Sequence, residues 1–205
     1  MSQRTSGIFS LLSSSFIYDL AQNLLGAQRS RKKFVEKYLQ DIEAARMLDI
    51  GCGTADILSF LPEDLDYTGC DMSEKYIEAA INRYGSRAKF YAKSVTDEFL
   101  DEGERFDVVL ASGLLHHLDD IDVISLLESV KLILAEGGVF VTIDPCYVQN
   151  QSWVSKTLIS KDRGQNVRHI DQYLSLARRV FSNSSVYHEN HLLRIPYDHA
   201  VMICK

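Results

Sequence analysis

The stretch Met47–Asp56, MLDIGCGTAD, decides how the rest of the chain is interpreted. It begins with an apolar run that is typical of a buried strand and continues into Gly51 and Gly53, which are separated by one residue. Glycines allow a tight turn and let the backbone approach a ligand, because no Cβ stands in the way. Thr54 is suited to cap a following helix. The stretch predicts a nucleotide-type site, because free backbone N–H groups collect at a helix N-terminus.

The spacing of the small residues distinguishes between two kinds of ligand. The dinucleotide fingerprint G-x-G-x-x-G/A requires a small residue three positions after the second glycine, but Asp56 stands there. An alternative pattern, acidic-x-Gly-x-Gly-x-small, is matched in the order Asp49, Gly51, Gly53, Ala55. The dinucleotide interpretation therefore fails. Taken alone, the turn also fits a loop that binds nothing.

The composition limits the classes of partner. With 46% hydrophobic and 24% charged residues, the 205-residue chain is typical of a globular protein. Its net charge of −6 argues against nucleic acid as the main partner, because phosphate binding requires a basic surface. No C-x-x-C pair occurs, which argues against a zinc ribbon, and no metal is among the expected ligands. We interpret the four cysteines as reduced thiols of a cytoplasmic protein. No run approaches the ~20 apolar residues of a membrane span.

Strands and helices are expected to alternate through the middle of the chain. Strands are predicted at Arg46–Ile50, Asp66–Cys70, Ala88–Ala92, Phe106–Ala111 and Val139–Ile143. Helices are predicted at Ala55–Phe60, at Ser73–Tyr84 with Ser73 as its cap, and at Ile121–Leu134, ended by Gly137-Gly138. Because the strands are continuous apolar runs, they predict a parallel sheet covered on both faces.

The two flanks of this region have a different character. About Phe9–Gln40 is expected to be a helical leader that Gly26 interrupts. After the last parallel strand, Tyr147–Gln165 is expected to be irregular and Ile170–Phe181 helical. Strands at Ser185–Leu193 and Tyr197–Cys204 should pair as an antiparallel hairpin. The predicted fold is α/β, Rossmann-like and doubly wound, with a mostly parallel seven-stranded sheet.

Asp71 is the second strong signal for a nucleoside. It stands at the end of the second predicted strand, 20 residues after Gly51 (71 − 51). A carboxylate at this place can accept hydrogen bonds from both ribose hydroxyls of a nucleoside. Its alternative role is that of a helix cap.

The region of Phe106-Asp107-Val108-Val109 leads into Leu115-His116-His117-Leu118. With the glycine turn and Asp71, these residues resemble the small-molecule type of class I S-adenosylmethionine (SAM)-dependent methyltransferases, over roughly residues 9–134. Ala55 departs from the pattern, because many members have a third glycine there. The resemblance implies SAM as the methyl donor and S-adenosylhomocysteine as its product. It also implies one domain over residues 1–205, with a leader (1–45), a SAM-binding core (46–145) and a substrate-side segment with the hairpin (146–205).

The resemblance implies a cofactor site built from the leader, the glycine turn and the ends of three further strands. Its expected members are Tyr18, Asp49, Gly51, Cys52, Gly53, Asp71, Met72, Ser94, Val95, Ala111 and Ser112. Met72 would pack on the adenine. Ser94 stands where many members carry an acid that contacts the adenine amino group. Tyr18 would face the ligand or belong to the core.

Candidate catalytic and substrate residues lie at the same edge of the predicted sheet. His116 is a candidate general base, because an imidazole titrates near neutrality; the alternative is that it packs and caps a helix. Asp144 is a candidate base or substrate anchor, or a turn residue before a proline. Arg163 and Arg168 flank a glycine and could clamp a phosphate or carboxylate, or lie on a surface loop with a salt bridge to Asp162. Tyr147 is the remaining candidate for substrate binding.

The predicted function is methyl transfer from SAM to a small, anionic metabolite by in-line displacement. Three alternatives stay open: a quinone-precursor methyltransferase, a protein methyltransferase, and a SAM-binding regulatory module without catalysis. A NAD-dependent oxidoreductase is disfavoured by the failed dinucleotide fingerprint. The expected partner is a small-molecule methyl acceptor rather than nucleic acid, and the expected state is a monomer or homodimer.

Overall fold

The computed structural model describes residues 26–40, 44–94 and 103–205. Tyr18 and Val95, both expected at the cofactor, lie outside these residues, as does the first part of the predicted leader. The division of the chain into leader, core and substrate-side segment therefore stays a prediction.

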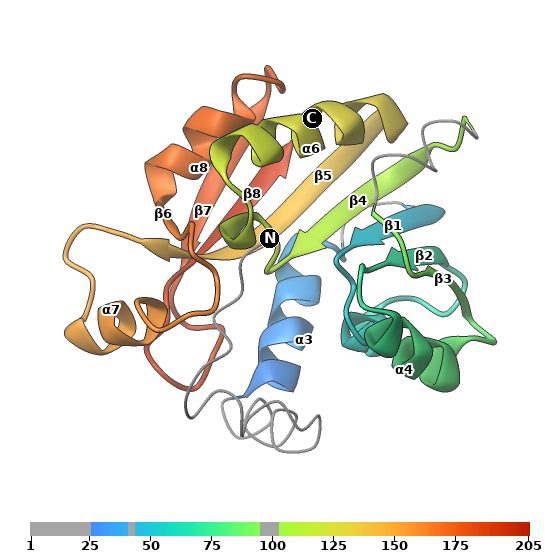
Figure 1. Cartoon of the computed structure of the whole chain (residues 1–205), viewed down its shortest axis with the longest axis horizontal. Helices are drawn as coiled ribbons and strands as arrows, with labels where there is room; N and C mark the ends of the chain where they lie inside the picture. The colour runs from blue at the N-terminus through green and yellow to red at the C-terminus, as the bar shows by residue number, and fades with distance from the viewer. Residues whose placement is uncertain (1–25, 41–43, 95–102) are drawn as a thin grey trace.

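A twisted sheet with the strand order β3-β2-β1-β4-β5-β8-β7 forms the centre of the molecule (Figure 1). The first five strands in this order, β3, β2, β1, β4 and β5, are parallel to one another, and β8 is antiparallel to both of its neighbours, β5 and β7. The strands are β1 (Arg46–Ile50), β2 (Asp66–Cys70), β3 (Ala88–Tyr91), β4 (Phe106–Ser112), β5 (Leu134–Tyr147), β7 (Ser184–Glu189) and β8 (His199–Cys204). A two-residue strand, β6 (Arg168–His169), pairs with the end of β5 beside this path. The predicted mostly parallel, seven-stranded sheet with an antiparallel C-terminal hairpin is confirmed.

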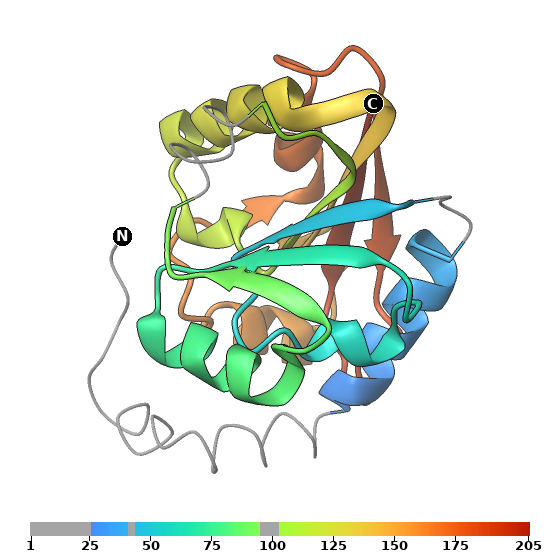
Figure 2. The same ribbon diagram turned by 90° about the vertical axis from the view of Figure 1, so that its right-hand side faces the viewer.

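Helices cover both faces of the sheet (Figures 1 and 2). One face carries α6 (Asp120–Ile133) and α8 (Ile170–Ala177), and the other carries α3 (Ala27–Tyr38), the 3₁₀ helix η1 (Asp56–Phe60) and α4 (Glu74–Tyr84). Successive strand residues alternate between the two apolar layers: Leu48 packs with the first set of helices and Met47 with the second. This two-sided burial explains why the strands are continuous apolar runs. No helix among the described residues is long and apolar enough to cross a membrane.

Side-chain caps fix the starts of the two longest helices that follow parallel strands. The Ser73 hydroxyl accepts a hydrogen bond from the Tyr76 backbone N–H at the start of α4, which confirms the predicted cap. At the start of α6, one oxygen of Asp119 accepts hydrogen bonds from the N–H groups of Ile121 and Asp122, each at 2.9 Å. Both helices therefore begin at the carboxyl edge of the sheet.

Three local predictions are wrong. Thr54 is not a cap, because the left-handed turn continues through Ala55 (φ 55°) and η1 begins only at Asp56. Gly137-Gly138 does not end α6, which ends at Ile133; β5 starts at once, and the glycine pair lies where its register against β4 shifts. The segment predicted to be irregular contains α7 (Trp153–Ile159), capped by the Ser152 hydroxyl.

The second half of the predicted leader is the helix α3, which begins directly after Gly26 (φ 86°). Its predicted apolar face, with Phe34, Val35 and Tyr38, is buried against the sheet. Lys33 on this helix donates a hydrogen bond to the backbone oxygen of His191, beyond β7. This contact and the apolar face dock α3 beside the C-terminal hairpin.

Candidate cofactor and substrate site

The chain reverses its direction of winding at the carboxyl ends of β1 and β4. These strands are neighbours, but β1 is followed by β2 on one side and β4 by β5 on the other. In open α/β sheets, ligands bind in the crevice outside such a switch point. The predicted cofactor residues in the described part of the chain come from strand ends and loops at this edge of the sheet.

The glycine turn and Asp71 form one hydrogen-bonded unit at this edge. The N–H groups of Gly51 and Cys52 both donate to the Cys70 carbonyl, at 2.8 and 3.0 Å. The Gly53 N–H donates to Asp71 Oδ2 at 3.1 Å, and the Ser73 N–H donates to Asp71 Oδ1 at 2.8 Å. Gly51 and Gly53 have φ values of 71° and 56°, which glycine adopts without strain. The turn after β1 is thereby tied to the carboxylate after β2.

Asp49 shows that the site is suited to a cofactor with a hydrogen-bond donor. Its Oδ2 accepts a hydrogen bond from the Tyr67 hydroxyl at 2.6 Å, but its buried Oδ1 has no partner within the described structure. Burial raises the pKa of Asp49 to about 7. At the neighbouring Gly53, an added Cβ would meet nothing within 4 Å, so the turn borders open space. A buried acceptor without a donor, next to such space, fits a ligand that supplies one.

The other predicted cofactor residues differ in exposure. Met72 follows Asp71 and is 61% exposed, which leaves an apolar surface for a ring to cover. Ser94 and Ser112 are exposed at the ends of β3 and β4, and Ala111 before Ser112 is fully buried. Their contacts with a cofactor stay predictions.

Cys52 is half-buried within the turn. Burial raises the pKa of its thiol. A Cβ added to Gly69 of β2 would lie 2.8 Å from the Cys52 sulfur, so that glycine leaves room for the side chain. Cys52 is therefore a neutral packing group at the base of the turn.

His116 lies in the short 3₁₀ helix η2 (Leu115–His117) and is held between two carboxylates. Its Nδ1 lies 2.8 Å from Asp144 Oδ1 and its Nε2 lies 3.2 Å from Asp162 Oδ1. Burial by itself would lower the pKa of His116, but the two carboxylates outweigh it and raise the pKa to about 9. The ring is therefore a cation at neutral pH. The geometry argues against the predicted base role of His116, because it has no free nitrogen to accept a proton.

His117 is the histidine next to His116 at this edge. It is half-buried, and its ring centroid lies 4.1 Å from that of His116. Burial and the positive charge of His116 lower its pKa below the ordinary value. Between the two adjacent histidines, the structure therefore favours the second as a proton acceptor.

Asp144 is the anchor of His116 rather than a turn residue. The Asp144 side chain is 1% exposed, and its Oδ1 also accepts a hydrogen bond from the His116 backbone N–H at 3.2 Å. Its Oδ2 has no hydrogen-bond partner in the described part of the chain. Asp144 thus fixes the loop after β4 to the end of β5.

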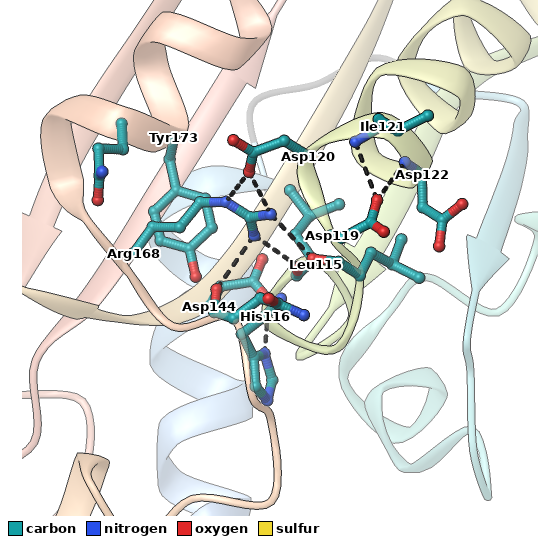
Figure 3. A network of polar contacts seen from close by, with 12 residues as sticks. Leu115, His116, Asp119, Asp120, Ile121, Asp122, Asp144, Arg168 and Tyr173 are labelled. Carbon is teal, nitrogen blue, oxygen red and sulfur yellow. Dashed lines mark hydrogen bonds and ion pairs between the residues drawn. The ribbon is translucent and has the colours of Figure 1, made fainter. Parts of the chain in front are cut away.

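Arg168 is buried and its guanidinium binds only the protein itself (Figure 3). Its five N–H donors are matched by five hydrogen bonds of 2.7–3.1 Å, to Asp120 Oδ1 twice and to the carbonyls of Leu115, Leu118 and Asn166. The predicted role of Arg168 in a substrate clamp is therefore corrected: no donor remains for a ligand. The salt bridge of Arg168 is made to Asp120.

Arg163 and Tyr147, the other two predicted substrate residues, are both half-buried on this side. The charge of Arg163 reaches His117 and contributes to lowering the pKa of that ring. The Tyr147 ring lies 5.7 Å from the His169 ring, across the pairing of β5 with β6. Arg163 is thus the cation of the predicted pair that lies beside the neutral histidine.

Two further residues belong to the site: Asp162, which the sequence analysis named only as a salt-bridge partner on a surface loop, and Tyr197, which it did not name as a site residue. Asp162 accepts hydrogen bonds from the Gly164 N–H at 2.8 Å and from the Tyr197 hydroxyl at 2.9 Å. Burial alone would raise the pKa of Asp162, but hydrogen bonds with His116 and Gly164 lower it to about 2. The sequence signal for Asp162 was its place between two cations, Lys161 and Arg163. The sequence held no signal for Tyr197, because only the fold brings it next to Asp162.

Across the described residues, no group of three or more His, Cys, Asp or Glu side chains is arranged to hold a metal ion. The candidate site consists of the glycine turn with Asp71 and a cluster of histidines, acids and one arginine beside it.

Comparison with known proteins agrees with this arrangement. A family model described as a methyltransferase domain matches residues 48–140. A ubiquinone biosynthesis O-methyltransferase from Sinorhizobium medicae is 39% identical over 89 residues, covering 42% of this chain and 36% of that protein. The pyocyanin biosynthetic protein PhzM superposes with a TM-score of 0.74 at 16% identity, covering 98% of this chain and 62% of that chain.

A third protein matches at nearly its full length. A SAM-dependent methyltransferase from Archaeoglobus fulgidus gives a TM-score of 0.72 at 18% identity, covering 92% of this chain and 99% of that one. The chain spans about a third of the length of the curated relative. Residues 48–140 of this chain match the methyltransferase domain model, and the chain has the fold of SAM-dependent methyltransferases, as the motifs indicated.

Proposed function

We propose that the chain is an enzyme that binds SAM at the glycine turn and transfers its methyl group to a small molecule. The observation that carries the proposal is the unit formed by the turn and Asp71. A carboxylate has about four lone-pair sites, and the two backbone donors of Gly53 and Ser73 occupy two of them. The remaining sites are available to the two hydroxyls of a ribose. SAM supplies an electrophilic methyl group on its sulfonium sulfur.

The task of the chain is then to bind and align the two reactants. Asp49 Oδ1 lacks a donor and would accept one from the cationic end of the cofactor. Aligning the acceptor atom with the methyl group and sulfur is worth several kcal/mol, and up to about 7–11 in ideal intramolecular cases. An acceptor hydroxyl must also lose its proton, and His117 is the neutral imidazole that can take it at pH 7.

The acceptor that fits best is a small molecule with a negative charge. Arg163 would bind that charge, and the same arginine lies near enough to influence His117. The charge of the acceptor and the hydroxyl to be methylated would then lie on neighbouring groups of one molecule. Arg168 takes no part in this binding.

A ubiquinone precursor is the second candidate acceptor. It is supported by the name of the curated relative, a ubiquinone biosynthesis O-methyltransferase, which matches 42% of this chain. The two candidates differ in the role of Arg163. An anionic metabolite requires it, whereas an uncharged quinone precursor does not.

A radiolabelled-methyl screen tests the proposal. Purified protein would be incubated with tritiated SAM and with pairs of phenols that differ only in having a carboxylate, a phosphate or neither. We expect transfer to the anionic members. Arg163→Ala should raise their KM about tenfold or more, because a hydrogen bond to a charged group contributes about 1.5–3 kcal/mol.

Lys161→Ala is the matched control, since it removes an exposed cation two residues away. It should leave the KM unchanged. Equal effects of the two substitutions, or transfer to neutral phenols alone, would contradict the anionic acceptor and favour the quinone precursor. Cofactor binding without transfer to any acceptor would instead favour a regulatory SAM-binding module.

A further inference from the structure

The segment 162–168, which contains Arg163, is fastened to the sheet edge at both of its ends. At one end, Asp162 contacts His116 and the Tyr197 hydroxyl. At the other end, Arg168 donates its hydrogen bonds to Asp120 and to carbonyls of the loop that contains η2. The position of Arg163 therefore depends on two separate anchors.

The anchor at His116 requires a protonated ring. Both ring nitrogens face carboxylate oxygens, at 2.8 Å for Asp144 and 3.2 Å for Asp162. A neutral imidazole has only one N–H, so one nitrogen lone pair would then face a carboxylate. Only the imidazolium donates to both acids at once, and only then does it join β5 to the segment 162–168.

The segment lies directly on this histidine. A Cβ added to Gly164 would come within 2.0 Å of His116 Cδ2 and 2.7 Å of the His116 carbonyl oxygen. The Asn166 N–H donates to that same carbonyl at 2.9 Å. The contact leaves no room for a side chain between the two, so a change at His116 is transmitted to the segment.

We propose that His116 is a positioning residue: through its paired contacts with Asp144 and Asp162, it holds the segment 162–168 and thereby places Arg163 for the methyl acceptor. The inference rests on the proposed function for the role of Arg163. It assigns His116 no contact with the reacting atoms.

The two anchors differ in how they respond to pH. The groups that face His116 are Asp144 from β5, Asp162 from the segment, and His117 from its own turn, with Tyr197 behind Asp162; the charge of Arg163 acts on the neighbouring His117. The pKa of His116 is raised to about 9 and that of Asp162 is lowered to about 2, so the pair is charged throughout the range between them. Above pH 9 the histidine anchor is lost, whereas the hydrogen bonds of Arg168 do not involve that proton. One end of the segment is then released and the other is retained.

A double-mutant cycle with His116→Asn and Asp162→Asn tests the inference. The asparagine amide can keep the contact with Asp144 but not the one with Asp162. Each substitution should raise the KM for the acceptor about tenfold, with kcat and the Kd for S-adenosylhomocysteine changed less than twofold. The KM of the double variant should equal that of either single variant, because both substitutions remove the same contact, the one between His116 and Asp162. In the wild type alone, KM should rise as the pH passes 9.

Hydrogen exchange gives a readout that needs no acceptor. Both variants should exchange the amides of residues 162–168 faster than the wild type at pH 7.5. Asp171→Asn, an exposed acid in the first turn of α8, is the matched control and should change neither KM nor exchange.

The outcomes separate this inference from the function on which it rests. A wild type that does not bind S-adenosylhomocysteine contradicts the proposed function. Normal binding and turnover with an unchanged KM in both variants, or with effects that multiply in the double variant, overturns the role of His116 alone. If His116→Asn does not fold, Asp162→Asn and the wild-type pH profile still decide the question.

Discussion

Asp49 shows how a single buried acid links the stability of the protein to its binding site. Burial raises its pKa to about 7, and the hydrogen bond from Tyr67 offsets only part of this effect. The folded protein therefore holds this proton more tightly than the unfolded chain does. Between about pH 4 and pH 7, the unfolded chain has lost the proton that the folded chain keeps, so this group makes folding less favourable as the pH rises.

Asp49→Asn should remove that part of the pH dependence. The melting temperature of the variant relative to the wild type should increase by several °C from pH 5 to pH 8, since about 1 kcal/mol corresponds to roughly 2–4 °C in a protein of this size. Thermal unfolding at the two pH values measures the difference, with the exposed Asp64→Asn as the control. Parallel melting curves for the variant and the wild type would contradict this account of Asp49.

The two histidines show what sequence reasoning cannot decide at the residue scale. His116 and His117 are adjacent and chemically identical in the sequence, and only the fold gives one of them two carboxylate neighbours. Arg168 is similar: its spacing from Arg163 suggested a clamp, but tertiary contacts use all of its donors. Asp71 could be singled out from the sequence, because it follows a predicted strand at a set distance from Gly51; its contact with a ribose stays a prediction.

At the scale of the elements, the strands with continuous apolar runs were predictable and several of the turns were not. The predicted bounds of β1 and β2 agree with the structure, because burial on both faces leaves a clear signal. The glycines at 137–138 led to a wrong prediction of the end of α6. A Cβ at Gly138 would lie 2.9 Å from the Ala135 carbonyl oxygen, so the glycine allows two backbone segments to lie close together. The helix α7 was missed although Ser152 offered a cap signal ahead of apolar residues at helical spacing.

Arg168→Lys tests how the loop that contains η2 is joined to α6 and β6. Lysine has three donors and no planar fork, so it leaves buried carbonyls such as that of Leu115 without a partner. Each lost partner should cost about 1–3 kcal/mol in the free energy of unfolding. Urea denaturation measures the loss, and Arg179→Lys, at an exposed position, should show none. Equal stabilities of the two variants would show that the Arg168 contacts contribute nothing.

At the scale of the whole molecule, the fold places two kinds of chemistry at one edge of the sheet. The ends of β1 and β2 carry the glycine turn and Asp71, the groups that we propose bind the nucleoside. The ends of β4 and β5 carry the histidine cluster, and the segment between α7 and α8 brings Arg163 to it. The parallel pairing of the strands was predictable from their alternation with helices. The contact of the segment 162–168 with His116 was not, because it joins residues far apart in the sequence.

The most direct test of the central claim is calorimetric titration of the protein with S-adenosylhomocysteine. The account predicts saturable binding by the wild type and by the control Asp64→Ala, which removes an exposed acid before β2. Asp71→Ala should bind about tenfold or more weakly, because it removes the charged acceptor of the ribose hydroxyls. Absence of binding by the wild type, or equal affinity in the two variants, would contradict the claim that this edge binds SAM.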